Sequence, residues 1–103
     1  MATAGNNLSA YNPEDVPNAK NFKFGLVVSE WNANITQNLF QGAFDAFIKH
    51  NVIKENIVRW NVPGSFELVY GAKKLAESFE MLDVIIVIGS VIEGETKHFD
   101  FVC

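Results

Sequence analysis

The sequence predicts an α/β domain built as a three-layer α/β/α sandwich with a parallel sheet. Three short apolar segments, residues 24–29, 57–62 and 83–89, are rich in β-branched side chains and indicate strands. Between them, apolar residues recur at helical spacing. Strands that alternate with helices in this way form a parallel sheet, and the helices cover its faces.

The composition limits the size and class of the protein. A length of 103 residues allows one domain at most, and 49% apolar with 19% charged residues is typical of a folded chain. The net charge of −4, with scattered Lys and Arg, provides no basic stripe for a nucleic acid. Because a domain this short buries a small share of its surface, we expect oligomerisation to add stability.

Cys103 is the single cysteine. An internal disulfide and a multi-cysteine metal site are therefore excluded, and a cytoplasmic location is favoured. Met1–Asn7 lacks a basic segment followed by an apolar run, so no signal peptide is expected. The longest apolar run, Val84–Ile88, is too short to span a membrane.

Residues 1–21 are polar and contain Pro13 and Pro17, which indicates an extended N-terminal arm ahead of a domain over residues 22–103. Two interpretations of this arm remain open. It is either a frayed tail or a segment that docks on a neighbouring subunit.

The first predicted strand, residues 24–29, leads into a polar loop and then a helix over residues 35–50. Asn51 follows the last helical turn, where Asn can adopt the left-handed conformation that ends helices. The apolar face of this helix comprises Leu39, Phe40, Ala43, Phe44, Phe47 and Ile48.

The second strand, residues 57–62, is stopped by Pro63 and Gly64, and the next helix is expected to open near Ser65. The third strand, residues 83–89, has an uninterrupted apolar sequence, which predicts burial on both faces. A further helix is expected to begin around Lys97. The apolar positions of the second helix are Leu68, Val69, Ala72, Leu75, Ala76 and Phe79.

Ligands of such sheets bind beyond the carboxyl ends of the strands, which selects the loops 29–34, 62–67 and 89–98. In the first loop, Trp31 could stack on a heteroaromatic ring or pack at the core edge or a subunit interface. In the second loop, free amides at a helix start could bind polar groups. Glu67 is favoured there by the helix dipole whatever the function, so a structural role is the stronger interpretation for this loop alone.

The third loop carries the side chains most suited to catalysis. Thr96 offers a hydroxyl and amides for an anion, and His98 is suited to proton transfer near neutral pH. Asp100 is close enough in sequence to be a partner of His98. From spacing alone, a structural or merely exposed histidine is the commoner outcome. No P-loop, dinucleotide-binding glycine motif or nucleophile elbow is present.

Taken together, the three loops resemble the lumazine synthase family. The matching segments are Val27–Asn32 with Ile35 and Thr36, then Val62–Leu68, then Gly94–Cys103, which has the form GETxHFDxVC. The match is colinear, covers residues 22–103, and is most specific in its last motif.

The resemblance implies a flavodoxin-like fold and a transferase in the penultimate step of riboflavin biosynthesis. The family condenses 5-amino-6-(ribitylamino)uracil with 3,4-dihydroxy-2-butanone 4-phosphate, and the products are 6,7-dimethyl-8-ribityllumazine, water and phosphate. It implies no metal and no organic cofactor. It also implies a homopentamer, a pentamer pair or a sixty-subunit shell, with riboflavin synthase as a further protein partner.

Carried over position by position, the resemblance gives each loop a role. The pyrimidine would stack on Trp31, the second loop would hold the ribityl chain, and the backbone of the third loop would read the uracil edge. The resemblance implies that His98 transfers protons and that the phosphate meets Thr96 and the amide of Glu95. The residues implied to bind the pyrimidine and the ribityl chain are Trp31, Ser65, Phe66, Glu67, Ser90, Val91 and Ile92.

Two departures from the family pattern matter. Glu93 stands where many members carry Arg or another non-acidic residue, close to the phosphate loop. Members also continue past the position of Cys103 with a last strand and helices, which supply a phosphate-binding arginine and an aromatic residue for a neighbouring subunit's pocket. We therefore expect a partial record of a longer protein. A molecule that ended at Cys103 would be poorly soluble and weakly active, and a flavodoxin-like binding module or an assembly role without catalysis remains the alternative.

Overall fold

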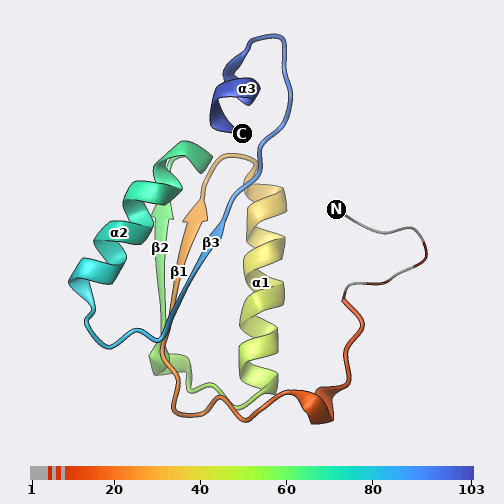
Figure 1. Cartoon of the computed structure of the whole chain (residues 1–103), viewed down its shortest axis with the longest axis vertical. Helices are drawn as coiled ribbons and strands as arrows, with labels where there is room; N and C mark the ends of the chain where they lie inside the picture. Colours follow the sequence, from red (N-terminus) through yellow and green to blue (C-terminus); the bar gives the residue numbers. More distant parts are fainter. Residues whose placement is uncertain (1–4, 6, 8) are drawn as a thin grey trace.

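The structure, a computed structural model, describes Gly5, Asn7 and residues 9–103 (Figure 1). Three parallel strands, β1 (Phe24–Ser29), β2 (Ile57–Val62) and β3 (Val84–Ile88), form one sheet in the order β2-β1-β3. The predicted α/β class with a parallel sheet is confirmed. The remaining elements are helices α1 (Ala33–Lys49), α2 (Leu68–Ser78) and α3 (His98–Val102) and the 3₁₀ turns η1 (Pro13–Asp15), η2 (Lys54–Asn56) and η3 (Ser65–Glu67).

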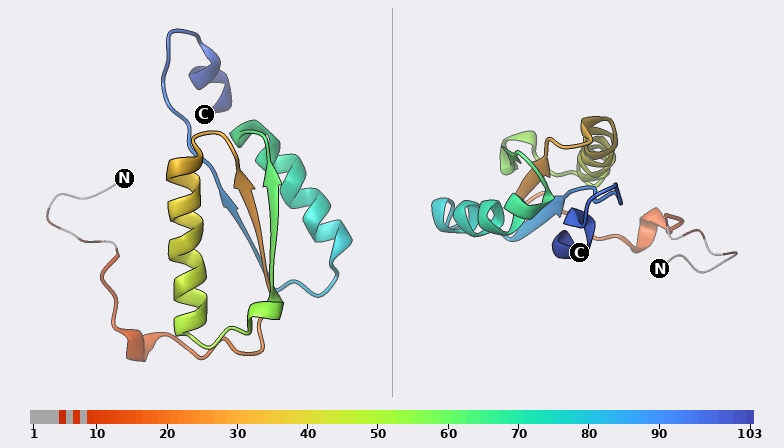
Figure 2. Two further views of the ribbon diagram at one scale, coloured as in Figure 1. Left: turned by 180° about the vertical axis from the view of Figure 1, so that it is seen from behind. Right: turned by 90° about the horizontal axis from the view of Figure 1, so that it is seen from above.

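The two long helices lie on opposite faces of the sheet, as the view from above shows (Figure 2). The chain moves from β1 to β2 on one side and then crosses back to β3 on the other side of β1. Because parallel crossovers are right-handed, this reversal places α1 and α2 on different faces. The three layers follow from the strand order.

The core on the α1 face is built from alternate residues of the strands. Leu26, Val28 and Ile88 are buried there, and the rings of Phe24 and Phe47 stack with their centroids 4.3 Å apart. Successive strand residues point to opposite faces, so β1 supplies both layers of the core. The half-buried side chains around this cluster are Phe24, Phe40, Ala43, Phe47, Ile57 and Ile86.

On the other face, glycines let α2 lie close to the sheet. A Cβ on Gly71 of α2 would lie 2.8 Å from Val27 Cγ1 and 2.9 Å from Val62 Cγ1. A Cβ on Gly25 of β1 would lie 2.6 Å from Cδ2 of Leu75, which is fully buried. All three distances are shorter than real Cβ contacts, so a side chain at either position would force its neighbours to shift.

Most predicted boundaries are confirmed. The first two strands span the predicted residues, and Asn51 has a φ of 72°, as expected after a helix end. The second helix opens with the 3₁₀ turn at Ser65 and continues as α2, but it ends at Ser78. Phe79 therefore lies beyond it in extended backbone and packs edge-on against Trp60, with the ring centroids 6.0 Å apart.

The expected burial of the third strand on both faces is wrong. Val84 and Val87 of β3 are 42% and 50% exposed, while Ile88 at its carboxyl end is buried. The reason is its position: β3 forms an edge of the sheet, and in the described part of the chain nothing pairs with its outer side. Apolar sequence predicts a strand but not its place in the sheet.

The described part of the N-terminal arm contacts the end of α1. The Ala19 amide donates to the His50 carbonyl at 3.0 Å, and the Tyr11 hydroxyl lies 3.3 Å from His50 Nε2. The Lys49 ammonium lies 5.6 Å from the centre of the Tyr11 ring. Most of Met1–Asn7 falls outside the described residues. Among the residues that are described, no helix is long and apolar enough to cross a membrane.

Replacing Gly71 with alanine tests the close contact between α2 and the sheet. The added methyl group would push the helix off Val27 and Val62. We expect Gly71→Ala to lower the free energy of unfolding by about 1–3 kcal/mol, measured by urea denaturation of the full-length protein.

Gly42 of α1 provides the matched control, because a Cβ there meets nothing within 4 Å. Gly42→Ala is expected to stabilise the protein by about 0.5–1 kcal/mol through helix propensity. Equal effects of the two substitutions would contradict the packing argument.

Candidate functional site

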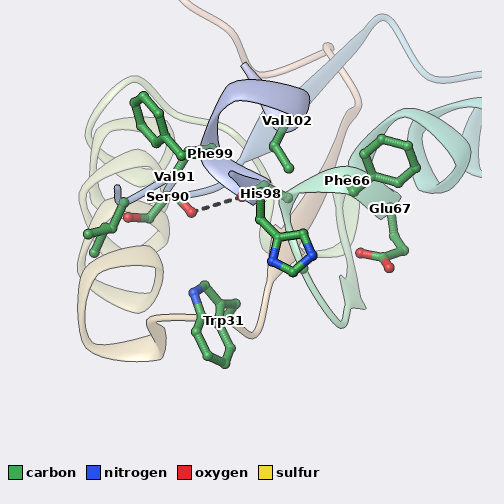
Figure 3. A pocket seen from close by; sticks show the side chains of 11 residues that line it. Trp31, Phe66, Glu67, Ser90, Val91, His98, Phe99 and Val102 are labelled. Atoms are coloured by element: carbon green, nitrogen blue, oxygen red, sulfur yellow. Dashed lines mark hydrogen bonds between the residues drawn. The ribbon is translucent and has the colours of Figure 1, made fainter. Parts of the chain in front are cut away.

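The carboxyl ends of the three strands meet at one edge of the sheet, where a cavity of about 230 Å³ opens (Figure 3). This edge lies at the point where the chain reverses direction between β1 and β3, which is the usual ligand position in parallel α/β sheets. The cavity is lined by Trp31, Gly64, Ser65, Phe66, Glu67, Ser90, Val91, Ile92, His98, Phe99 and Val102.

The loop after β1 presents Trp31 and is tied to the end of β2. The Glu30 amide donates to the Val62 carbonyl at 2.8 Å, and the Trp31 amide donates to the Pro63 carbonyl at 3.1 Å. The Trp31 side chain itself is 66% exposed. The backbone is therefore held while the indole keeps a free face, an arrangement suited to stacking on a planar ligand.

The second and third loops are joined through Ser65. Its hydroxyl donates to the Ser90 carbonyl at 3.0 Å. A Cβ on Gly89, which follows β3, would lie 2.7 Å from Ser65 Oγ and 2.7 Å from Leu68 Cδ1. The missing side chain at position 89 thus leaves the space that the Ser65 hydroxyl occupies.

His98 is the first residue of α3, and its ring points into the cavity beside Trp31 and Glu67 (Figure 3). Its Nδ1 lies 2.9 Å from the Thr96 hydroxyl oxygen. If that hydroxyl donates, Nε2 carries the ring proton and can give it to a ligand.

Asp100, which is close enough in sequence to be a partner of His98, is not hydrogen-bonded to it in the described residues. The Asp100 amide donates to the Lys97 carbonyl. Residues two apart on a helix do not face each other, whereas Thr96 lies before the helix and can reach back to the ring.

The structure brings together most of the site residues singled out from sequence. Glu95 and Thr96 do not line the cavity; they lie in the exposed segment before α3, and Thr96 reaches the site through its bond to His98. The predicted residues that line the cavity are Trp31, Ser65, Phe66, Glu67, Ser90, Val91, Ile92 and His98.

Three further lining residues were not singled out: Gly64, Phe99 and Val102. The signal for two of them was present, because positions 98, 99 and 102 fall on one side of a helix. Gly64 gave no such signal, since a glycine after a strand commonly ends it.

The lining groups define what the cavity can do. Trp31 can stack on a ring, the Glu67 carboxylate can accept hydrogen bonds, and the His98 imidazole can move a proton. Within the described residues, no group of three His, Cys, Asp or Glu side chains could hold a metal ion. Two larger hollows, of about 450 Å³ near Lys23 and about 590 Å³ on the outer side of α2, have no histidine in their lining.

The three strand-end loops enclose aromatic rings, a carboxylate and an imidazole. These features are typical of α/β proteins that bind small molecules. Residues 21–103 match the profile of the family described as 6,7-dimethyl-8-ribityllumazine synthase. The chain belongs to that family.

Curated relatives carry the same description. All 103 residues align with a 6,7-dimethyl-8-ribityllumazine synthase of Christiangramia forsetii at 71% identity, covering 61% of that protein. The corresponding proteins of Flavobacterium johnsoniae and Flavobacterium psychrophilum are 60% and 57% identical over the same residues, which cover 54% of each. The chain thus spans between half and two thirds of the length of these relatives.

A double-mutant cycle tests the fit between Ser65 and Gly89. Gly89→Ala alone would displace the Ser65 hydroxyl and Leu68, and we expect it to lower the free energy of unfolding by about 1–3 kcal/mol. In a Ser65→Ala background the same change is expected to cost about 1 kcal/mol less, because no hydroxyl has to move.

Gly94→Ala is the control for this cycle, since a Cβ at that position meets nothing within 4 Å. Its effect on stability should stay within about 0.5 kcal/mol. Additive effects of Gly89→Ala and Ser65→Ala, measured by chemical denaturation, would show that the two positions are not coupled.

Proposed function

We propose that the full-length protein condenses 5-amino-6-(ribitylamino)uracil with 3,4-dihydroxy-2-butanone 4-phosphate to form 6,7-dimethyl-8-ribityllumazine. The observation that carries this proposal is the cavity that Trp31, Glu67 and His98 share, each from a different strand-end loop or the helix after it. These side chains supply the stacking surface, the hydroxyl acceptor and the proton carrier that the reaction requires. Family membership supports the same reaction.

In this proposal the pyrimidine stacks on the indole of Trp31. The backbone of residues 90–92 hydrogen-bonds to the uracil edge, and the carboxylate of Glu67 accepts hydrogen bonds from the ribityl hydroxyls. Because the Ser65 hydroxyl already donates to the Ser90 carbonyl, Ser65 contacts the ribityl chain through its oxygen lone pairs or its amide. Phe66, whose side chain is 72% exposed, covers the chain on its apolar side.

The phosphate of the second substrate is assigned to the segment before α3. Thr96 and Glu95 offer their amides, because the single hydroxyl proton of Thr96 is engaged when it donates to His98 Nδ1 and the Glu95 carboxylate would repel the anion. The hydrogen bond between Thr96 and His98 supports this assignment, since it keeps the phosphate position next to the proton-transfer residue.

The reaction needs protons to move in several steps. The pyrimidine amine attacks the butanone carbonyl, and the resulting imine forms with loss of water. Elimination of phosphate and ring closure with loss of a second water then follow, and His98 is positioned to carry protons between the leaving groups and the ring. Much of the rate enhancement is expected from holding two reactive substrates side by side.

We also propose the setting in which the protein works. Residues 1–21 act as an arm outside the domain of residues 22–103, and the protein assembles as a homopentamer or a larger shell in the cytoplasm, with riboflavin synthase as a partner. The exposed apolar side chains of Phe66, Val69 and Tyr70 near the start of α2 support an assembly interface. Light scattering on the full-length protein should give a mass of five subunits or a multiple of five.

One observation favours a second candidate, a binding module without catalysis. Among the described residues that line the cavity, none is a Lys or Arg, so the lining carries no cation for a phosphate. Such a module would tolerate replacement of His98, and the ribitylaminouracil would not protect it against heat.

Replacement of His98 tests the catalytic assignment. His98→Ala should lower kcat by about 100-fold or more while leaving activity above background, because general acid–base transfer is lost but substrate positioning remains. The measurement is formation of 6,7-dimethyl-8-ribityllumazine by the full-length protein.

His50→Ala is the matched control. His50 follows the carboxyl end of α1, the end away from the cavity, and its ring lies near the Tyr11 hydroxyl. Its kcat should stay within about twofold of the unaltered protein. Unchanged turnover in His98→Ala would refute the catalytic role.

Replacement of Trp31 tests the stacking assignment. Trp31→Ala should raise the KM for the ribitylaminouracil by about tenfold, whereas Trp31→Phe should retain most of the affinity, because a phenyl ring still offers a stacking face. Trp60→Phe, which alters the other tryptophan of the sequence, in β2, should leave this KM unchanged. Equal KM values for Trp31→Ala and Trp31→Phe would argue against stacking.

A further inference from the structure

We propose that Thr36 is a positioning residue for the pyrimidine site: its hydroxyl holds the turn between β1 and α1 and thereby fixes where Trp31 presents its indole. The inference rests on the proposed function, because it assigns the affinity for the pyrimidine to a residue outside the cavity. Thr36 does not line the cavity.

Thr36 closes the turn at both ends. Its side chain is 1% exposed, and its hydroxyl donates to the carbonyl of Ser29, the last residue of β1, at 2.7 Å. Its amide donates to the Asn32 carbonyl at 3.1 Å. One residue in the first turn of α1 therefore holds both ends of the segment 29–32, and Trp31 lies within that segment.

The turn needs such support because its backbone is unusual. Asn32 has φ 57° and ψ 52°, in the left-handed region that is less stable than the right-handed one for a residue with a side chain. This conformation redirects the chain from the end of β1 into α1. Hydrogen bonds at the β1 end and at the α1 end of the turn hold Asn32 in this less stable conformation.

The indole depends on this backbone more than a buried side chain would. Trp31 is 66% exposed, so side-chain packing contributes little to its orientation. Its backbone is held by the bonds to β2, from Glu30 and Trp31 to the Val62 and Pro63 carbonyls, and by the bonds that Thr36 makes. Loss of the Thr36 hydroxyl removes the tie to β1 and leaves the tie to β2.

The hydroxyl is separable from the packing of the helix. Valine has nearly the shape of threonine but cannot donate a hydrogen bond, so Thr36→Val keeps the volume and deprives the buried Ser29 carbonyl of its donor. Serine keeps the donor and loses only a methyl group. The rest of α1 continues to pack on the sheet through Phe40 and Phe47 in all three forms.

The experiment compares Thr36→Val with Thr36→Ser in the full-length protein by steady-state kinetics. Thr36→Val is expected to raise the KM for the ribitylaminouracil by about five- to tenfold, the order set by one lost hydrogen bond. The KM for the butanone phosphate and kcat should change by less than about twofold, since His98 and its loop are untouched. Thr36→Ser should restore the pyrimidine KM.

Ser78→Ala is the matched control. The Ser78 hydroxyl also donates to a backbone carbonyl, that of Lys74, at 2.7 Å, but at the end of α2 far from the cavity. Its loss should leave both KM values unchanged. The inference is overturned if both Thr36→Val and Ser78→Ala change kcat and both KM values in proportion to the loss in free energy of unfolding. Thr36 would then be only structural.

A second measurement needs no substrate. In a Trp60→Phe background Trp31 is the sole tryptophan of residues 1–103, and its fluorescence anisotropy decay reports how freely the indole moves. Thr36→Val should enlarge the fast component, and Thr36→Ser and Ser78→Ala should not. An unchanged decay in Thr36→Val overturns the inference. Absence of pyrimidine binding by the unaltered protein would instead refute the proposed function, and the anisotropy result would still decide the role of Thr36.

Discussion

β1 is hydrogen-bonded along both of its edges, to β2 on one side and to β3 on the other, and the rest of the molecule depends on this pairing. Because the connection from β1 to β2 and the connection from β2 to β3 run in opposite directions across the sheet, right-handed crossovers send α1 and α2 to opposite faces. The carboxyl ends of the three strands lie at one edge of this sheet, and the loops that follow them line the cavity. The position of the site therefore follows from the strand order and not from any residue in it.

Hydrogen bonds between loops turn this open space into a defined site. The backbone of Trp31 is bonded to the end of β2, Ser65 is bonded to the carbonyl of Ser90, and Thr96 is bonded to His98. Each bond holds a segment that lines or adjoins the cavity. Exposed side chains have little packing to orient them, so the site depends on backbone and hydroxyl contacts where the core depends on apolar packing.

The predictions from sequence succeeded where local physics decides. The periodicity of α1, the β-branched residues of β1 and the left-handed Asn51 are properties of short segments, and all three are as expected. They failed where the outcome depends on distant parts of the chain. The exposure of Val84 and Val87 follows from the edge position of β3, which is set by its pairing with β1 far away in the sequence.

By itself the sequence determined the elements, the parallel α/β class, the motifs and hence the family, because apolar periodicity, turn residues and motif spacing are local. Only the tertiary structure decided that the residues of three loops line one cavity and that the Ser65 hydroxyl fills the space left by Gly89. It alone showed that a buried threonine ties the end of β1 to α1. Contacts between segments far apart in sequence are set by strand order and close packing, and these exist only once the whole sheet has formed.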